Sequence, residues 1–339
     1  MKFLRKILYP FSLLYGLITS IRNYLYNKHI ITSKQFKTPT IVVGNLSVGG
    51  TGKTPQIEYL IRLLQNDYKI AVLSRGYKRK SNGFIIADEN ATAEIIGDEP
   101  FQYYLKFPNI IVCVDADRTN AIQQLEALEN PPDIILLDDA FQHRRVNAGF
   151  NILLTAYDNL YVDDSMLPTG NLRENKFGAK RAHVIIVTKC PYNISEVEQF
   201  EISKKLNLTE KQFVFFATIE YDNELKGASN LNLSELKNTE ILLVTGIANP
   251  IPLQEYLTNQ KIKFKHLKYP DHYQFKEKDI AEINSEFKLL KSNNKIVLTT
   301  EKDYVRIFAD LQNLQFISIK TKFVKNKTSF DKLIKNYVE

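Results

Sequence analysis

The sequence predicts an α/β protein with a mostly parallel sheet and a second, smaller α/β domain. Short apolar runs rich in β-branched residues alternate with segments of helical periodicity, the pattern of parallel strands covered by helices on both faces. A length of 339 residues favours two domains. With 44% hydrophobic and 24% charged residues and only two cysteines, the chain is neither disordered nor built on a disulfide framework.

Residues 1–30 form the first predicted element, and they carry the one anomaly of the composition. The formal net charge is +7, and eight basic residues precede the first acidic residue, Glu58. The remainder of the chain holds 37 basic and 38 acidic residues, so we do not expect a nucleic-acid partner. Fifteen uncharged, mostly apolar residues lie between Lys6 and Arg22.

This apolar stretch is too short to span a bilayer, which takes about 20 residues, and Pro10 interrupts it. It lacks the small-residue cleavage site that follows the core of a signal peptide. We therefore expect an amphipathic helix that lies in the headgroup layer of a membrane, with its basic residues toward anionic lipid. The alternative is a helix packed on the protein's own core.

The next domain, predicted over residues 31–225, opens with a β-branched strand at Thr40–Val43. A glycine-rich turn over residues 47–54 follows, and apolar residues at helical spacing begin at Ile57. Strand, glycine-rich loop, Gly-Lys-Thr and helix together are typical of a phosphate-binding loop. We expect Lys53 to reach the β- and γ-phosphates of a nucleotide and the Thr54 hydroxyl to ligate Mg²⁺.

This loop departs from the common pattern at its first position, where a serine replaces the glycine that shapes the turn. An ordinary glycine-rich turn is the alternative, but the strand and the helix on either side favour nucleotide binding. The predicted phosphate-binding residues are Ser47, Val48, Gly49, Gly50, Thr51, Gly52, Lys53 and Thr54.

A second acidic element supports this prediction. Residues 133–137 form an apolar strand that ends in Asp138 and Asp139. In phosphate-loop enzymes such a strand lies beside the first strand and directs a carboxylate toward the metal. Either aspartate is therefore a candidate Mg²⁺ ligand, although alone the pair would indicate only a surface turn.

Further strands are predicted at residues 69–73, 110–114, 150–154 and 184–187. Near residue 225 the composition becomes polar, which indicates a linker. The second α/β domain, predicted over residues 226–339, begins with a strand at Ile241. Open α/β sheets bind ligands beyond the carboxyl ends of their strands, where several charged clusters of this sequence fall.

Taken in order, these motifs resemble those of the tetraacyldisaccharide 4′-kinase family of lipid A biosynthesis. They are a basic apolar N-terminus, GNLSVGGTGKT, SRGY, GDEP, DADR, LLDDAFQH, LPTGNLRE, VTGIANP, PDHY and TEKD. The resemblance implies a P-loop NTPase-like core that transfers the γ-phosphate of ATP, with Mg²⁺, to the 4′-hydroxyl of a tetraacylated glucosamine disaccharide 1-phosphate. It also implies a place at the cytoplasmic face of a Gram-negative inner membrane. No obligate protein partner is expected.

The resemblance assigns the role of base to Asp98 of the GDEP motif and that of its partner to His272 of the PDHY motif. Phosphoryl transfer also needs a cation near the γ-phosphate, and Arg118 is our candidate. The alternatives are a helix N-cap for Asp98 and a surface loop histidine for His272. Glu174 is left open between a contact with metal or acceptor and a salt bridge with Arg173 or Lys176.

Two other functions would use the same phosphate loop. One is a membrane-associated ATPase or switch protein, which would hydrolyse ATP without a lipid acceptor and would not need Asp98 and His272. The other is a non-catalytic scaffold that senses a nucleotide. Replacing Lys53 would leave the function of such a scaffold largely intact.

Overall fold

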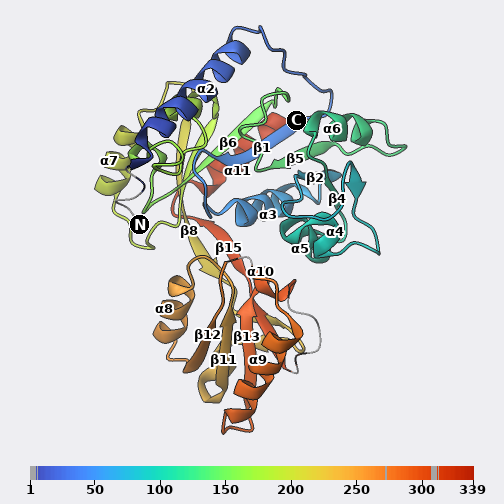
Figure 1. The fold of residues 1–339 in the computed structure, drawn as a ribbon, viewed down its shortest axis with the longest axis vertical. Helices are drawn as coiled ribbons and strands as arrows, with labels where there is room; N and C mark the ends of the chain where they lie inside the picture. Colours follow the sequence, from blue (N-terminus) through green and yellow to red (C-terminus); the bar gives the residue numbers. More distant parts are fainter. Residues whose placement is uncertain (1–4, 6, 272, 307–310, 312) are drawn as a thin grey trace. The chain divides into compact units, whose positions relative to one another are not determined.

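The computed structural model describes residues 5, 7–271, 273–306, 311 and 313–339 (Figure 1). The chain divides into two compact units, of which unit 1 comprises Met1–Ile219 and Thr321–Glu339 and unit 2 comprises Glu220–Lys320. This division differs from the predicted second domain at residues 226–339. The last residues return to unit 1 because the C-terminal helix buries Phe330 and Ile334 in the core of that unit.

Unit 1 is built on a sheet of nine strands with the order β15-β8-β7-β6-β1-β5-β2-β4-β3. β1 pairs in parallel with β5 and β6, and the parallel pairing extends through β2 and β4 on one side and through β7 and β8 on the other. Only β3 is antiparallel to its neighbour among the pairs described. The strands are β1 Thr40–Asn45, β2 Ile70–Ser74, β3 Ile85–Ile86, β4 Ile111–Val114, β5 Ile134–Asp138, β6 Phe150–Ala156, β7 Val184–Thr188, β8 Phe213–Tyr221 and β15 Ile319–Phe323.

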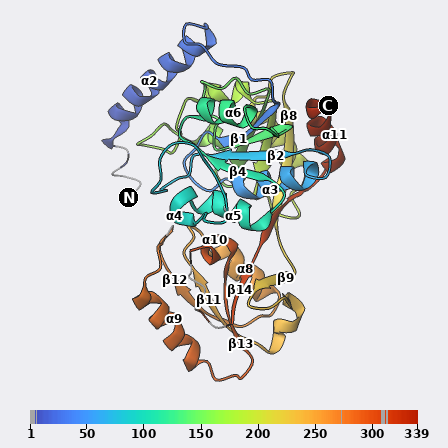
Figure 2. The same cartoon turned by 90° about the vertical axis from the view of Figure 1, so that its right-hand side faces the viewer.

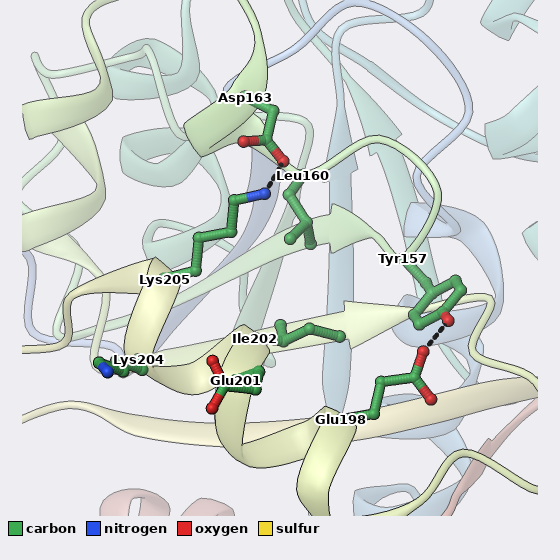
Figure 3. A pocket seen from close by; sticks show the side chains of 8 residues that line it. All are labelled: Tyr157, Leu160, Asp163, Glu198, Glu201, Ile202, Lys204 and Lys205. Atoms are coloured by element: carbon green, nitrogen blue, oxygen red, sulfur yellow. Dashed lines mark hydrogen bonds and ion pairs between the residues drawn. The ribbon is translucent and has the colours of Figure 1, made fainter.

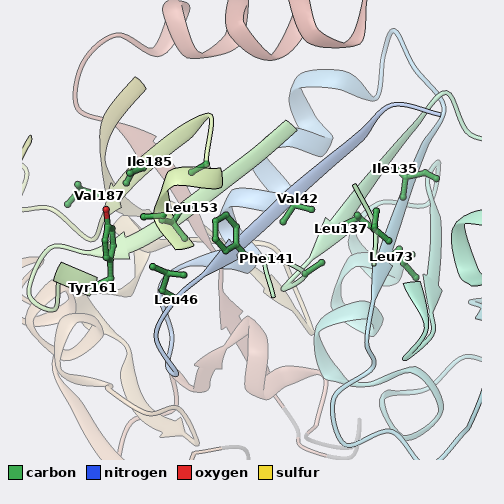
Figure 4. Packing of buried hydrophobic residues seen from close by; sticks show 14 of the residues in the cluster. Val42, Leu46, Leu73, Ile135, Leu137, Phe141, Leu153, Tyr161, Ile185 and Val187 are labelled. Carbon is green, nitrogen blue, oxygen red and sulfur yellow. The ribbon is translucent and has the colours of Figure 1, made fainter. Parts of the chain in front are cut away.

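Helices cover both faces of this sheet, as the predicted α/β class requires. The helices of unit 1 are α2 Tyr9–Asn27, α3 Lys53–Leu64, α4 Ala93–Ile96, α5 Asp98–Lys106, α6 Arg118–Glu126, α7 Glu196–Leu206 and α11 Lys327–Val338, with short 3₁₀ turns at Tyr161–Asp163 and Lys176–Arg181. One core lies between the sheet and α3, α5 and α11, and the other between the sheet and α6 and α7. Figure 4 shows the second core, in which Val42 and Leu137 of neighbouring strands point to the same face.

Unit 2 has a sheet of six strands with the order β10-β9-β14-β13-β11-β12. Its centre is parallel, since β11 pairs with β12 and β13, and β13 pairs with β14. The strands are β9 Glu224–Gly227, β10 Leu231–Asn232, β11 Glu240–Thr245, β12 Phe264–Lys268, β13 Lys295–Thr300 and β14 Leu314–Ile317; the helices are α8 Ile251–Asn259, α9 Glu277–Leu289 and α10 Glu301–Tyr304, with a 3₁₀ turn at Leu233–Asn238. The prediction of an α/β protein is confirmed in both units.

The N-terminal helix α2 lies at the margin of unit 1 in both views (Figures 1 and 2). Its orientation is unusual, because polar Ser12 and Thr19 are buried while most of its large apolar side chains face outward. The apolar residues that are at least half exposed are Tyr9, Phe11, Leu13, Leu14, Leu17, Ile18, Ile21 and Tyr24. Within the described ranges, no helix has both the length and the apolar character needed to cross a bilayer.

Candidate active site

The phosphate loop connects β1 to α3, and its backbone has a shape that glycine permits. Gly49 and Gly52 have φ values of 126° and 85°, which residues with side chains rarely adopt. The first N–H groups of α3, which begins at Lys53, have no partner within the helix. An anion here would meet these N–H groups and the positive end of the helix dipole.

Side chains from two neighbouring regions of the sheet hold this loop. Asn45 Nδ2 donates to Thr51 Oγ1 at 2.8 Å and to the carbonyl of Gly49 at 3.3 Å. On the other side, Thr188 Oγ1 donates to the carbonyl of Thr51 at 2.8 Å. The loop is therefore fixed from the ends of β1 and β7.

The first two residues of the loop bind to the protein itself. Ser47 is buried, and the N–H of Val48 donates to the carbonyl of Asn171 at 2.7 Å. Gly50 lies on the open side, since an added Cβ would meet no described atom within 4 Å. Ser47 and Thr51 are thus buried against the protein, whereas residues 48–50 are the exposed part of the loop and residues 52–54, at the start of α3, are half-buried.

Asp138 ends β5 opposite Val43 of β1 and is 2% exposed. Ser74 Oγ and the Tyr103 hydroxyl donate to its Oδ2, each at 3.3 Å, while Oδ1 has no hydrogen-bond partner among the described residues. Burial, followed by the charges of Glu99 and Asp139, raises the pKa of Asp138 to about 7. A cation beside this orphaned oxygen would stabilise the ionised form.

Asp139 has very different surroundings. Arg173 donates to both of its oxygens, with Nη2 at 2.7 Å from Oδ1 and Nη1 at 3.1 Å from Oδ2, and Lys53 Nζ lies 3.8 Å from Oδ2. Burial raises the pKa of Asp139, but Lys53 and Arg173 outweigh it, and the net shift is downward. Lys53 of the phosphate loop thus forms an ion pair with Asp139, the second residue of the aspartate pair.

Tyr103 of α5 connects two predicted ligands of the metal. Its hydroxyl contacts Asp138 and is also within hydrogen-bonding reach of Thr54. Thr54 and Asp138 therefore lie in the same small region. A hydroxyl oxygen and an orphaned carboxylate oxygen are the donors that a hard divalent cation such as Mg²⁺ prefers.

Arg118 is the first residue of α6 and is 3% exposed. Its Nη1 donates to the carbonyl of Asp115 at 2.7 Å. Burial lowers the pKa of Arg118 to about 10, and the nearby charge of Asp138 opposes that shift. The guanidinium therefore remains charged near neutral pH within electrostatic reach of the aspartate pair.

Asp98 is the first residue of α5, and the N-cap of that helix is Gly97. An added Cβ on Gly97 would lie 3.1 Å from Cα of Gly76, so the GDEP and SRGY motifs pack backbone against backbone. The charge of Glu99 acts on Asp138, which brings the first turn of α5 within electrostatic reach of the site. The predicted partner of Asp98, His272, lies outside the described residues.

Glu174 is fully buried and makes structural contacts. It accepts hydrogen bonds from Asn23 Nδ2 at 2.7 Å, Gln142 Nε2 at 3.0 Å and Arg181 Nη2 at 2.8 Å. The ion pair forms with Arg181, not with either neighbour considered from the sequence. This carboxylate connects helix α2 to the rest of unit 1.

The expectation that the basic residues of the N-terminal helix face lipid is wrong for two of them. Arg5 donates to the carbonyls of Pro168 and Gly170, and Arg22 donates to the carbonyl of Gln142. These guanidinium groups turn toward unit 1 because carbonyl oxygens are available there. The outward face of α2 is apolar.

A surface pocket of about 690 Å³ lies elsewhere, between the segment after β6 and helix α7 (Figure 3). It contains no predicted site residue. Lys205 and Asp163 form an ion pair of 2.7 Å in it, and the Tyr157 hydroxyl donates to Glu198. Its charged groups are thus partly neutralised by one another.

Two residues of the site escaped the sequence reasoning. From the sequence, Arg173 is a candidate only for a salt bridge with Glu174, and its place in the LPTGNLRE motif is the one signal that points to the site. Tyr103 has no local signal, because a tyrosine inside an amphipathic helix is ordinarily a core residue.

A glycine-rich loop between a parallel strand and a helix, with a buried aspartate on the neighbouring strand, defines a nucleotide-binding protein of the phosphate-loop class. The chain matches the model of the tetraacyldisaccharide-1-P 4′-kinase family, LpxK, over residues 4–339. It belongs to this family. The resemblance of the motifs is thereby confirmed.

Relatives and a solved structure agree with this assignment. The tetraacyldisaccharide 4′-kinases of Flavobacterium johnsoniae and Flavobacterium psychrophilum are 54% and 57% identical to this chain, and each match covers 100% of the chain and 98% of the relative. The crystal structure of LpxK from Aquifex aeolicus in complex with ATP is 32% identical, with a TM-score of 0.80 over 99% of this chain and 100% of the other. The chain is an ATP-dependent kinase of lipid A biosynthesis, and the ATPase or switch alternative is not favoured.

Proposed function

We propose that residues 47–54 hold the phosphates of ATP and that the γ-phosphate passes to the 4′-hydroxyl of a tetraacylated glucosamine disaccharide 1-phosphate. The observation that carries this site assignment is the buried Asp138, which has one oxygen without a partner among the described residues and is joined to Thr54, at the start of α3, through the Tyr103 hydroxyl. The bond between the γ-phosphorus and the β–γ bridging oxygen breaks, and the 4′-oxygen bonds to that phosphorus. ADP and the 1,4′-bisphosphate are the products.

Thr54 and Asp138 are the residues that fit Mg²⁺, which when bound would neutralise charge on the β- and γ-phosphates. Asp139 was an equal candidate in the sequence. In the structure both of its oxygens accept from Arg173, and one also faces Lys53, so we assign it to holding Lys53 toward the phosphates. Arg118 would stabilise charge that develops on the transferring group.

Asp98 would accept the proton of the 4′-hydroxyl, and His272 would orient that carboxylate or receive the proton. Asp98 suits this role because it is half-buried at the start of α5, on a different element from Asp138, and its neighbour Glu99 lies within electrostatic reach of Asp138. The two carboxyl groups would thus divide the work. One would hold the metal while the other handles the proton.

Helix α2 would hold the enzyme on an anionic membrane surface, at the cytoplasmic face of the inner membrane. Its outward apolar side chains would enter the headgroup and acyl boundary, where the lipid acceptor lies. Each buried Leu or Phe contributes roughly 1.5–3 kcal/mol, so eight exposed apolar residues suffice for a peripheral attachment. Neither a nucleic acid nor an obligate protein partner enters this proposal.

The direct test supplies γ-labelled ATP, Mg²⁺ and the disaccharide 1-phosphate dispersed in detergent. A labelled lipid that carries one more phosphate is the expected product, and replacing Lys53 with Ala should remove it. Release of labelled inorganic phosphate without any labelled lipid would contradict the proposed acceptor and favour an ATPase.

A further inference from the structure

One segment of unit 1 touches both helix α2 and the phosphate loop. We call residues 165–174 the clamp segment. On one side, Asn171 accepts from the N–H of Val48, and the N–H of Arg173 donates to the carbonyl of Leu46 at 2.8 Å. The clamp segment therefore pairs with the backbone that leads into the phosphate loop.

On its other side, the clamp segment accepts hydrogen bonds from polar side chains of α2. Ser12 Oγ donates to Thr169 Oγ1 at 2.6 Å, and the Tyr15 hydroxyl donates to the carbonyl of Arg173 at 2.9 Å. Farther along, Asn23 donates to Glu174 at 2.7 Å. The spacing of these three residues places them on one side of the helix, opposite its apolar side.

Arg173 is the residue on which these contacts converge. Its N–H donates to the carbonyl of Leu46, and its carbonyl accepts from the Tyr15 hydroxyl. Its guanidinium donates to both oxygens of Asp139 and to the carbonyl of Asn45. Asn45 in turn fixes the phosphate loop through Thr51. A bidentate contact depends on accurate placement of the guanidinium plane, so it is sensitive to the backbone that carries it.

We infer that Tyr15 is a positioning residue of the nucleotide site. Its hydroxyl fixes the backbone of Arg173, and Arg173 sets the positions of Asp139 and of the phosphate loop. By linkage, a shift of α2 that changes this contact must change the affinity for the nucleotide. This inference rests on the proposed assignment of residues 47–54 to the phosphates of ATP.

The test replaces Tyr15 with Phe, which removes one hydroxyl and leaves the ring. The control is Tyr68→Phe, between α3 and β2, whose ring is half-buried and whose hydroxyl makes no hydrogen bond among the described residues. For Tyr15→Phe, both the Kd for Mg·ATP without lipid acceptor and the KM for ATP should rise about three- to tenfold, because one structural hydrogen bond is lost. The kcat and the KM for the lipid of Tyr15→Phe should stay within about twofold, and so should all values of Tyr68→Phe, which loses no hydrogen bond.

A double-mutant cycle with Arg173→Lys separates positioning from a general loss of stability. If Tyr15 acts through Arg173, its hydroxyl should contribute little to ATP affinity once Arg173→Lys has removed the bidentate contact with Asp139. The effects of Tyr15→Phe and Arg173→Lys on ATP affinity should then be far from additive. Additive effects, or a Tyr15→Phe protein with wild-type ATP affinity, would overturn the inference. Lys53→Ala, measured in parallel, tests the site itself: unchanged ATP affinity there would refute the proposed site and not the contact of Tyr15.

Discussion

Asp138 and Asp139 are neighbours in the chain, yet the structure places their carboxyl groups in opposite surroundings. Asp138 is buried, with one oxygen unpartnered among the described residues, and its pKa is raised by burial to about 7. Asp139 is also subject to burial, but Lys53 and Arg173 lower its pKa on balance. One carboxylate thus keeps an oxygen without a partner among the described residues, and the other belongs to the protein's own charge network.

This contrast predicts opposite effects on stability. At pH 8 the Asp138 carboxyl group is ionised in both the unfolded and the folded protein, but burial makes its ionisation unfavourable in the folded protein. Asp138→Asn should therefore raise the Tm of the metal-free protein by about 2–5 °C at pH 8, and most of the gain should be lost near pH 4, where Asp138 is protonated in the folded protein and about half protonated in the unfolded chain. Asp139→Asn should instead lower the Tm at pH 8, because it removes a carboxylate whose pKa is lowered. Thermal unfolding between pH 4 and pH 8 checks both signs, and equal shifts for both variants would contradict the assignment.

The proposed binding of Mg²⁺ by Asp138, together with the raised pKa of this carboxyl group, predicts a pH dependence of the metal requirement. A proton and the metal compete for this carboxylate, so the apparent Mg²⁺ affinity should fall as the pH decreases through 7, approaching about tenfold per pH unit at lower pH. The measurement is the Mg²⁺ concentration for half-maximal activity at pH 6, 7 and 8, corrected for protonation of ATP. An affinity that does not change with pH would exclude Asp138 as the ligand.

Asp98→Asn tests the proposed base. The substitution keeps the size of the side chain but removes its ability to accept a proton, so kcat should fall by about 10²–10⁴ while the Kd for ATP stays unchanged. Glu94→Gln, on the preceding helix, is the control, because its carboxylate pairs only with exposed Lys80 among the ion pairs described. If Asp98→Asn turned over at the rate of this control, another group would have to be the base.

Leu17→Glu tests the apolar side of α2. Leu17 is 57% exposed, so a charge there should leave the fold and the contact of Tyr15 intact. It should weaken binding to vesicles of anionic phospholipid by about tenfold or more, since one buried leucine is lost and a like charge is added. Vesicle sedimentation measures this effect, with Val197→Glu on α7 as the control for a charge at an exposed apolar site. Equal binding of the two variants would show that α2 does not enter the bilayer.

The local parts of the site could be predicted from the sequence because they depend on adjacent residues. A strand, a glycine-rich turn and Gly-Lys-Thr locate the phosphate loop, and an apolar strand that ends in two aspartates locates its partner. The difference between Asp138 and Asp139 could not be predicted. It arises from the burial of Asp138 and from Lys53 and Arg173, which the fold brings to Asp139 from distant segments.

The N-terminal helix shows the same limit. Its length and apolar content could be predicted, whereas the direction of its apolar side could not, since periodicity alone does not say whether such a side faces a core or the outside. Ser12, Tyr15 and Asn23 settle this point, because each finds a hydrogen-bond partner in unit 1.

The return of residues 321–339 to unit 1 has a consequence for synthesis on the ribosome. Strand β15 lies beside β8 in the sheet, and α11 adds Phe330 and Ile334 to the core around α3. Unit 2, however, lies between β8 and β15 in the chain and is translated before β15 and α11. A nascent chain therefore leaves the apolar core residues of α3 and β8 uncovered until the last residues of the chain have been synthesised. During that interval we expect the emerging polypeptide to need a chaperone.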